Sequence, residues 1–195
     1  MHELTKRQEE IIYKATQIID KKGIQGLTIK NLSSEIGVTE GAIYRHFKNK
    51  REILDYILEQ FLQNIKQFRN EKYVEKLSVF EAFNSVFHHF RKVFEKNPAV
   101  VSVIFAEEIF QNDSQLSKKV SEIIRNNEQI MFEIINNGKE RGEIRTTLND
   151  QMMVNSLLGT FRFMVKKWKI NSFKGSLKKD VDNLLEYLKA TVFTE

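Results

Sequence analysis

Residues 28–50 read TIKNLSSEIGVTEGAIYRHFKNK, and this stretch decides the fold. Thr28 is a suitable N-cap for a short helix, because its hydroxyl can accept a hydrogen bond from an orphan backbone N–H. Gly37 ends that helix, Thr39 is a second N-cap, and another short helix runs to about Phe47. Two short helices joined by a tight turn predict a helix-turn-helix motif.

The second of these short helices is expected to carry the DNA-reading face. Its open side presents Thr39, Glu40, Gly41, Ala42, Tyr44, Arg45 and His46. The small residues Gly41 and Ala42 let the backbone approach the floor of a groove. Tyr44, His46 and the following Lys50 suit phosphate contacts. The Arg45 side chain suits either a base edge or the backbone.

The chain resembles the TetR family of one-component regulators over roughly residues 6–60. The resemblance is carried by Leu27-Thr28, Ile36-Gly37-Val38-Thr39 and Gly41-Ala42-Ile43-Tyr44-Arg45-His46-Phe47, with Lys50 and Leu54 after them. It implies a homodimer that binds a palindromic operator, usually as a repressor. It also implies a helical C-terminal domain whose ligand weakens DNA binding. Beyond residue 60 the agreement is in helix count and length, plus Arg141-Gly142-Glu143.

Three residues of the motif have two interpretations each. An acid at Glu40 repels phosphate, yet it can accept a hydrogen bond from cytosine N4, or it can simply favour the helix start. Thr28 is first a cap, with any phosphate contact secondary. Lys30 is either a solvated lysine or a DNA contact. For the whole motif, the alternative is a three-helix bundle that touches no DNA, which the exposed basic side chains disfavour.

Composition supports a helical, DNA-binding protein. The 195-residue chain has a net charge of +5 and a pI of about 9.2, and residues 1–52 hold ten Lys/Arg against seven Asp/Glu. It contains one proline, eight glycines and no cysteine. No sustained period-2 alternation predicts strands, and no apolar run or signal peptide points to a membrane or to export. A cytoplasmic location is expected.

Helical periodicity nearly everywhere predicts an all-α fold of about nine helices. The expected helices span about 6–22, 28–36, 39–47, 49–65, 77–94, 98–109, 114–142, 149–171 and 177–192. Gly23 is expected to end the first of them. Residues 1–50 form the expected DNA-binding domain, and 51–195 form the expected ligand-binding and dimerisation domain.

The C-terminal region has more large aromatic residues than a small bundle needs, since fourteen of the fifteen phenylalanines lie beyond residue 50. A mainly apolar cavity with a few polar groups is typical of a small-molecule site. We therefore expect a hydrophobic or aromatic effector, such as an acyl chain, with a polar head near Asn127, His88 or Arg162. The candidate ligand-binding residues are Phe87, His88, Phe105, Asn127, Met131, Phe161, Met164 and Trp168. The alternative is that the aromatic rows are simply core.

The last two helices are the expected dimer interface. Their apolar stripes are Leu157, Phe161, Met164 and Trp168, and Val181, Leu184, Leu188 and Val192. Paired with the same surfaces of a second copy, they would form a four-helix bundle. Two recognition helices would then lie one DNA turn apart, roughly 34–36 Å. The alternative is that both stripes are buried within one subunit.

Enzyme signatures are missing from the sequence: it has no H-E-x-x-H, no P-loop and no G-x-S-x-G. His88 and His89 are adjacent, so on a helix they diverge by about 100° and cannot both face one metal. A metal site pairing His88 with Glu107 or Glu108 is the remaining enzymatic alternative. We expect no enzyme activity, cofactor or metal. An activator, or a helix-turn-helix protein controlled by a protein partner, stays open beside the repressor.

Overall fold

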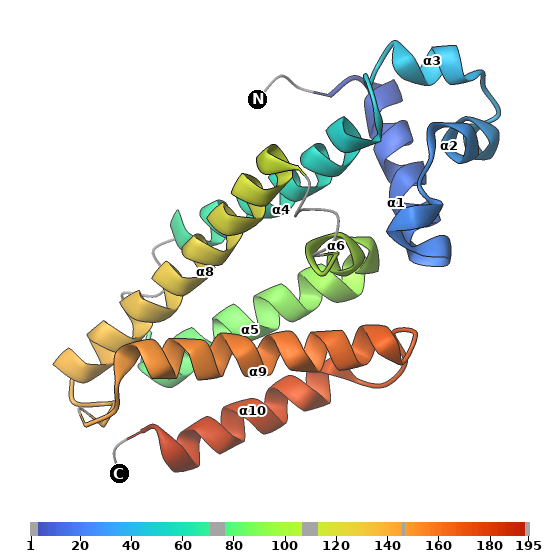
Figure 1. Cartoon of the computed structure of the whole chain (residues 1–195). Helices are drawn as coiled ribbons and strands as arrows, with labels where there is room; N and C mark the ends of the chain where they lie inside the picture. Colours follow the sequence, from blue (N-terminus) through green and yellow to red (C-terminus); the bar gives the residue numbers. More distant parts are fainter. Residues whose placement is uncertain (1–3, 71–76, 107–112, 146, 194–195) are drawn as a thin grey trace. The chain divides into compact units, whose positions relative to one another are not determined.

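The computed structural model describes residues 4–70, 77–106, 113–145 and 147–193. Those residues contain nine α-helices and one isolated bridge, between Ile144 and Phe193 (Figure 1). The helices are α1 (Lys6–Gly26), α2 (Ile29–Ile36), α3 (Glu40–Tyr44), α4 (Lys50–Asn70), α5 (Val79–Lys96), α6 (Pro98–Ile104), α8 (Ser114–Glu140), α9 (Asp150–Ile170) and α10 (Leu177–Thr191). The all-α prediction is confirmed.

The chain packs as two compact units. Unit 1 combines Met1–Leu62 with Asn97–Ser121, and unit 2 combines Gln63–Lys96 with Glu122–Glu195. Helices α4 and α8 therefore each contribute residues to both units. The expected domain division at residue 50 stays a prediction.

Helix α1 begins at a capping box. The Thr5 hydroxyl accepts from the backbone N–H of Gln8 at 3.3 Å, and the Gln8 side chain accepts from the N–H of Thr5 at 3.0 Å. Gly23 interrupts this helix at the position where its end was expected. It adopts φ 69° and ψ 176°, which kinks the helix, and one more turn follows to Gly26. Glycine tolerates the left-handed backbone that such a kink needs.

Unit 1 has an aliphatic core. Helix α1 buries Ile11, Ile12, Ala15, Ile18 and Ile19, and it packs against α2 and α6. From the helix-turn-helix, Leu32, Ile43 and Phe47 are buried, as expected, whereas Ile36 and Val38 are half-buried. This core fixes the two short helices by their inner faces and leaves their outer faces in solvent.

Unit 2 has an aromatic core built mainly on α5. Phe83 and Phe87 are fully buried, and the Phe87 ring lies 5.4 Å from the Phe161 ring of α9. Phe94 stacks on the same Phe161 ring at 6.1 Å between centroids. Helix α10 packs against both α5 and α9. Such aromatic pairs stabilise the fold by more than the burial of their apolar area alone.

The apolar stripes expected at the dimer interface are instead largely buried within unit 2. On α9 and α10 the buried members are Leu157, Phe161, Trp168, Val181, Leu184 and Leu188. Met164 and Val192 are half-buried. The expectation that this surface pairs with a second copy is therefore wrong. A helix can bury only one side against its own unit, and here that side is the large apolar stripe.

Candidate DNA-reading and effector sites

Helix α2 is positioned by its first residues. The hydroxyl of Thr28 accepts a hydrogen bond from the backbone N–H of Asn31 at 3.0 Å, so Thr28 is an N-cap. The Asn31 amide in turn donates to the carbonyl oxygen of Gly26 at 2.8 Å. These two bonds link the end of α1 to the start of α2.

The turn between α2 and α3 depends on Gly37. This residue is in the left-handed region, with φ 79° and ψ 37°, and its N–H donates to the carbonyl of Ser33 at 2.9 Å. The N–H of Val38 donates to the same carbonyl at 2.9 Å. A side chain at Gly37 would be strained by this backbone, so the glycine sets the angle at which α3 leaves α2.

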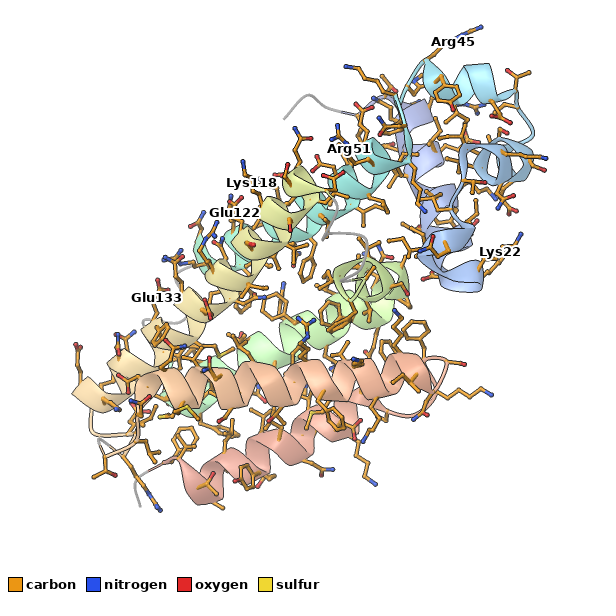
Figure 2. All side chains as sticks on the ribbon, viewed as in Figure 1. Lys22, Arg45, Arg51, Lys118, Glu122 and Glu133 are labelled. Carbon is orange, nitrogen blue, oxygen red and sulfur yellow. The ribbon has the colours of Figure 1, made fainter. Side chains whose placement is uncertain are left out.

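Helix α3 presents an open face above the small core. Thr39 caps it by accepting from the N–H of Ala42 at 3.3 Å. The Tyr44 side chain is 51% exposed, and Figure 2 shows Arg45 pointing outward from the end of α3. The exposed members of the predicted DNA-binding set are Thr28, Lys30, Thr39, Glu40, Gly41, Tyr44 and Arg45, and the half-buried ones are Ala42, His46 and Lys50.

Nothing within the described part of the chain requires a glycine at position 41. A Cβ atom built on Gly41 would meet only the Thr39 hydroxyl, at 3.9 Å, which is ordinary van der Waals contact. Gly41 also lacks the positive φ that would favour glycine. With glycine at this position, the outer face of α3 carries no side chain there.

Lys50 has a structural contact that the sequence did not reveal. Its ammonium donates to the carbonyl oxygen of Ile24 at 2.6 Å, and burial lowers the pKa of this lysine. The contact ties the first residue of α4 to the turn of α1 that follows the Gly23 kink. Because the expected helix stopped at Gly23, sequence reasoning had no partner for Lys50 on this side.

Ion pairs join α4 and α8, and sequence reasoning missed them. In unit 1, the Lys119 ammonium lies 2.8 Å from Asp55 and 2.9 Å from Glu59. Burial disfavours the lysine charge, but the hydrogen bonds to the two carboxylates outweigh it, so the pKa of Lys119 is raised. In unit 2, Lys66 pairs with Glu122 at 2.7 Å; Figure 2 labels Glu122 on α8.

Seven of the eight candidate effector residues belong to unit 2. Among them, Phe87, Met131, Phe161 and Trp168 are buried, and His88, Asn127 and Met164 are half-buried. Phe105 is the C-cap of α6 and belongs to unit 1, so it is not grouped with the other seven.

Asn127 stands out in the buried side of α8. Its Oδ1 atom is buried and has no hydrogen-bond partner within the described residues. The neighbours at helical spacing are Ile123, Ile130 and Met131, all buried. A buried amide oxygen without a donor is costly, by roughly 1–3 kcal/mol. An incoming donor would remove that cost.

His88 is occupied within the protein. Its Nε2 atom lies 3.2 Å from the Asp182 carboxylate of α10, and its Nδ1 atom accepts from the Arg91 guanidinium at 3.2 Å. Burial lowers the pKa of His88, and the nearby Asp182 carboxylate only partly offsets it. Arg91 also pairs with Glu95. These contacts join α5 to α10.

The metal alternative involves residues outside the described ranges. Glu107 and Glu108 are among them, so the structure gives no geometry for a pairing with His88. Across the part of the chain that is described, no three potential ligands lie together in a way that suits a metal ion. In the same residues, no helix is long and apolar enough to span a bilayer.

Two family models match the chain. "Bacterial regulatory proteins, tetR family" matches residues 11–57, and "YsiA-like protein, C-terminal region" matches residues 51–191. The fatty acid metabolism regulator protein of Bacillus subtilis (strain 168) is 27% identical over 181 residues, which are 92% of each chain.

Solved structures of regulators share the fold. The ketosteroid transcriptional regulator KstR2 of Mycobacterium tuberculosis has a TM-score of 0.80 at 18% identity, covering 99% of this chain and 98% of that one. The regulator FadR from Bacillus subtilis, in complex with stearoyl-CoA, has a TM-score of 0.75 at 24% identity, covering 93% and 97%. These similar proteins are transcriptional regulators. The chain belongs to the TetR family of bacterial regulatory proteins, and it is a ligand-responsive transcriptional regulator.

Proposed function

We propose that two copies of this chain bind a palindromic operator in the cytoplasm and repress transcription until a small hydrophobic effector releases them. The observation that carries the proposal is the outer face of α3, where nothing among the described residues requires the glycine at position 41. The protein acts by binding, with no enzyme activity, cofactor or metal.

The DNA contacts follow from the exposed face of the helix-turn-helix. Gly41 and Ala42 allow α3 to lie close to the groove floor, and Tyr44 and Arg45 reach the backbone or a base edge beside it. The remaining contacts assigned to DNA are Thr28, Lys30, Thr39, Glu40, His46 and Lys50. Among these, the Glu40 carboxylate would accept from cytosine N4.

The outer face of α9 is the proposed interface with the second copy. Met152, Phe163 and Ile170 are 61%, 66% and 72% exposed and recur at helical spacing on this face. Gly159 lies between them, and a Cβ atom there would meet nothing within 4 Å. On α10, Tyr187 is 64% exposed. Large exposed apolar side chains in a row are typical of an interaction surface. Because regulators of this family bind DNA as dimers, we assign this surface to contact with a second copy of the chain.

The proposed effector is a long-chain acyl thioester. The similar protein of Bacillus subtilis is named a fatty acid metabolism regulator, and the similar FadR structure from that species contains stearoyl-CoA. The aromatic rows of unit 2 suit an acyl chain, and the buried Asn127 Oδ1 atom needs a donor. The amide N–H groups of a pantetheine thioester can donate to it, whereas an ionised fatty acid only accepts.

Helix α8 is the proposed route from effector to DNA. It carries Asn127 in unit 2 and Lys119 in unit 1, where the lysine binds Asp55 and Glu59 of α4. Since α4 begins at Lys50, directly after the helix-turn-helix, a displacement of α8 reaches the DNA-binding elements through this lysine.

Selection from a randomised DNA library tests the function. We expect the purified protein to enrich a palindrome, to bind it as a dimer, and to release it when stearoyl-CoA is added. The Asn127→Leu variant should bind the same palindrome but need at least tenfold more stearoyl-CoA for release. Lys119→Met should keep stearoyl-CoA binding and lose release. Enrichment of no sequence would refute the DNA-binding proposal.

A further inference from the structure

One stretch of unit 2 combines many basic residues with no acidic one. Between residues 151 and 179 the chain has no Asp or Glu and seven Lys/Arg. The basic residues are Arg162, Lys166, Lys167, Lys169, Lys174, Lys178 and Lys179. They occupy the second half of α9, the connection after it and the start of α10, at the turn of the α9–α10 hairpin (Figure 1). We call this set the basic turn.

Three of these residues share one flank of α9. Arg162, Lys166 and Lys169 are spaced by four and three, so their side chains leave the helix in similar directions, with Lys166 at the rim of the proposed dimer face. Lys169 is half-buried, and its pKa is lowered first by burial and then by the charge of Lys166. The two ammonium groups are thus close enough to repel, which makes the cluster electrostatically unfavourable in isolation.

A strained connection holds the other lysines near this flank. Ser172 and Phe173 have φ of 54° and 60°, the left-handed region that non-glycine residues rarely adopt. The Phe173 ring meets the Trp168 indole edge-on, with centroids 4.9 Å apart. The N–H of Phe173 also donates to the carbonyl of Trp168 at 2.9 Å. The chain therefore reverses tightly, and Lys174 lies in that reversal.

Among the described residues, most lysines of the basic turn have no acidic partner. Lys178 pairs with Asp182 at 2.8 Å. For Lys166, Lys167, Lys169, Lys174 and Lys179, no ion pair with an acidic residue is present within the described residues. Like charges at one place repel one another, and an anionic partner would relieve that repulsion.

The basic turn also borders the aromatic core. Arg162 follows the buried Phe161 directly, and Lys169 follows the buried Trp168. Both basic residues are half-buried, so part of each side chain lies beside the core. A molecule with an apolar chain and a polyanionic head would match this adjacency of aromatic and basic side chains.

We propose that the basic turn binds the phosphate groups of a phosphorylated acyl thioester. This inference rests on the proposed function, and it names which part of the chain distinguishes a coenzyme A thioester from an unphosphorylated one. Lysine ammonium groups bind phosphates as point charges, and half-burial at Lys169 strengthens the attraction. The acyl chain contributes affinity through the core, and the phosphates contribute selectivity through the basic turn.

Two thioesters that differ in phosphate content test the inference. Stearoyl-CoA and S-stearoylpantetheine carry the same acyl chain and the same amides, but only the first carries phosphates. We expect calorimetry on the full-length dimer to show at least tenfold tighter binding of stearoyl-CoA at low salt, with the ratio shrinking as salt rises. The triple variant K166Q/K169Q/K174Q should bind both thioesters equally.

A matched triple variant controls for net charge. K21Q/K96Q/K118Q removes three exposed lysines elsewhere, and it should keep the wild-type preference for stearoyl-CoA. Loss of the preference in this control would overturn the inference, because general charge would then be responsible. Equal binding of both thioesters by the wild type would also overturn it.

The outcomes separate this inference from the proposed function. Release of DNA by both thioesters at equal concentrations would support the effector proposal and refute the role of the basic turn. Phosphate-dependent binding without release of DNA would support the basic turn and refute the effector proposal. A K166Q/K169Q/K174Q variant that loses operator affinity without effector would make the basic turn a DNA contact and overturn the inference. Binding of neither thioester would refute both.

Discussion

Helices α3 and α5 both carry residues that the sequence marks for binding, but the protein uses them differently. On α3 the Tyr44 side chain is 51% exposed, and the space around Gly41 is open. On α5 the Phe87 ring is fully buried against Phe161, and His88 is bonded to Asp182 and Arg91. The difference teaches that a residue without a role inside the subunit is the stronger sign of a binding function. In unit 2, that criterion points first to Asn127, whose buried Oδ1 atom has no donor among the described residues.

The largest expected effect is on the stability of the α5 core. Phe87→Ala should lower the free energy of unfolding by about 3–5 kcal/mol, because it removes a fully buried ring and leaves a cavity. Chemical denaturation would measure this, with Tyr44→Ala as the exposed control at under about 0.5 kcal/mol. A loss below about 1 kcal/mol for Phe87→Ala would contradict the difference between the two helices, since it would indicate that the Phe87 ring is not tightly packed.

Next in size is the effect of the exposed tyrosine on DNA affinity. Tyr44→Phe should weaken operator binding by about 1.5–3 kcal/mol if the hydroxyl donates to a phosphate, without changing stability. Because a phosphate contact carries no sequence information, the loss should be equal on operators with altered bases. Fluorescence anisotropy on a panel of such operators would measure it, and a loss restricted to one base position would contradict the assignment.

A smaller effect is expected at the end of α3. Arg45→Ala should reduce the slope of log affinity against log salt by about 0.9, the value for one released counterion on duplex DNA. Binding titrations between low and physiological salt would determine the slope. An unchanged slope would indicate that Arg45 contacts a base edge rather than the DNA backbone.

The glycine of α3 should give effects of opposite sign. Gly41→Ala should raise the free energy of unfolding by up to about 1 kcal/mol, because alanine favours a helix and its Cβ meets only one atom, at 3.9 Å. The same variant should weaken operator binding, since the added methyl group occupies the space between α3 and the groove floor. Denaturation and anisotropy on one preparation would show both. Unchanged DNA affinity would remove the best argument for close approach.

The smallest effect should come from pH at the α5–α10 contact. Burial lowers the pKa of His88 below its ordinary value of 6.5, so the unfolded chain binds a proton more readily than the folded one. Stability should therefore fall as the pH drops below about 6.5 and should be fully present above it. His88→Gln should flatten this part of the stability–pH curve. If His88→Gln kept the wild-type slope of stability against pH, the pH dependence would arise from another group.

Local chemistry made much of unit 1 predictable. The caps at Thr28 and Thr39 and the turn at Gly37 depend on residues a few positions away, so the sequence shows both partners at once. The contacts that escaped prediction join distant segments. Lys50 meets Ile24 across the kink of α1, and Lys119 lies 64 residues from Asp55 in the sequence.

The sequence predicted that unit 2 is a helical bundle. It did not predict which side of each helix packs within the unit and which side is exposed. Periodicity shows that α9 has an apolar stripe, but it does not say whether that stripe meets its own unit or a second copy. The side of Phe161 meets its own unit, and the side of Phe163 is exposed. Choosing between two apolar sides of one helix requires the positions of its neighbours, which no local pattern contains.

Two helices that are shared between units have a consequence for how the protein melts. Helix α4 passes from unit 1 to unit 2 after Leu62, and α8 does so after Ser121. Each unit contains part of both helices, so the unfolding of either unit interrupts both helices at its boundary. Unfolding should therefore be one cooperative transition, with equal calorimetric and van't Hoff enthalpies, and the helix-turn-helix should share the lifetime of the domain that regulates it.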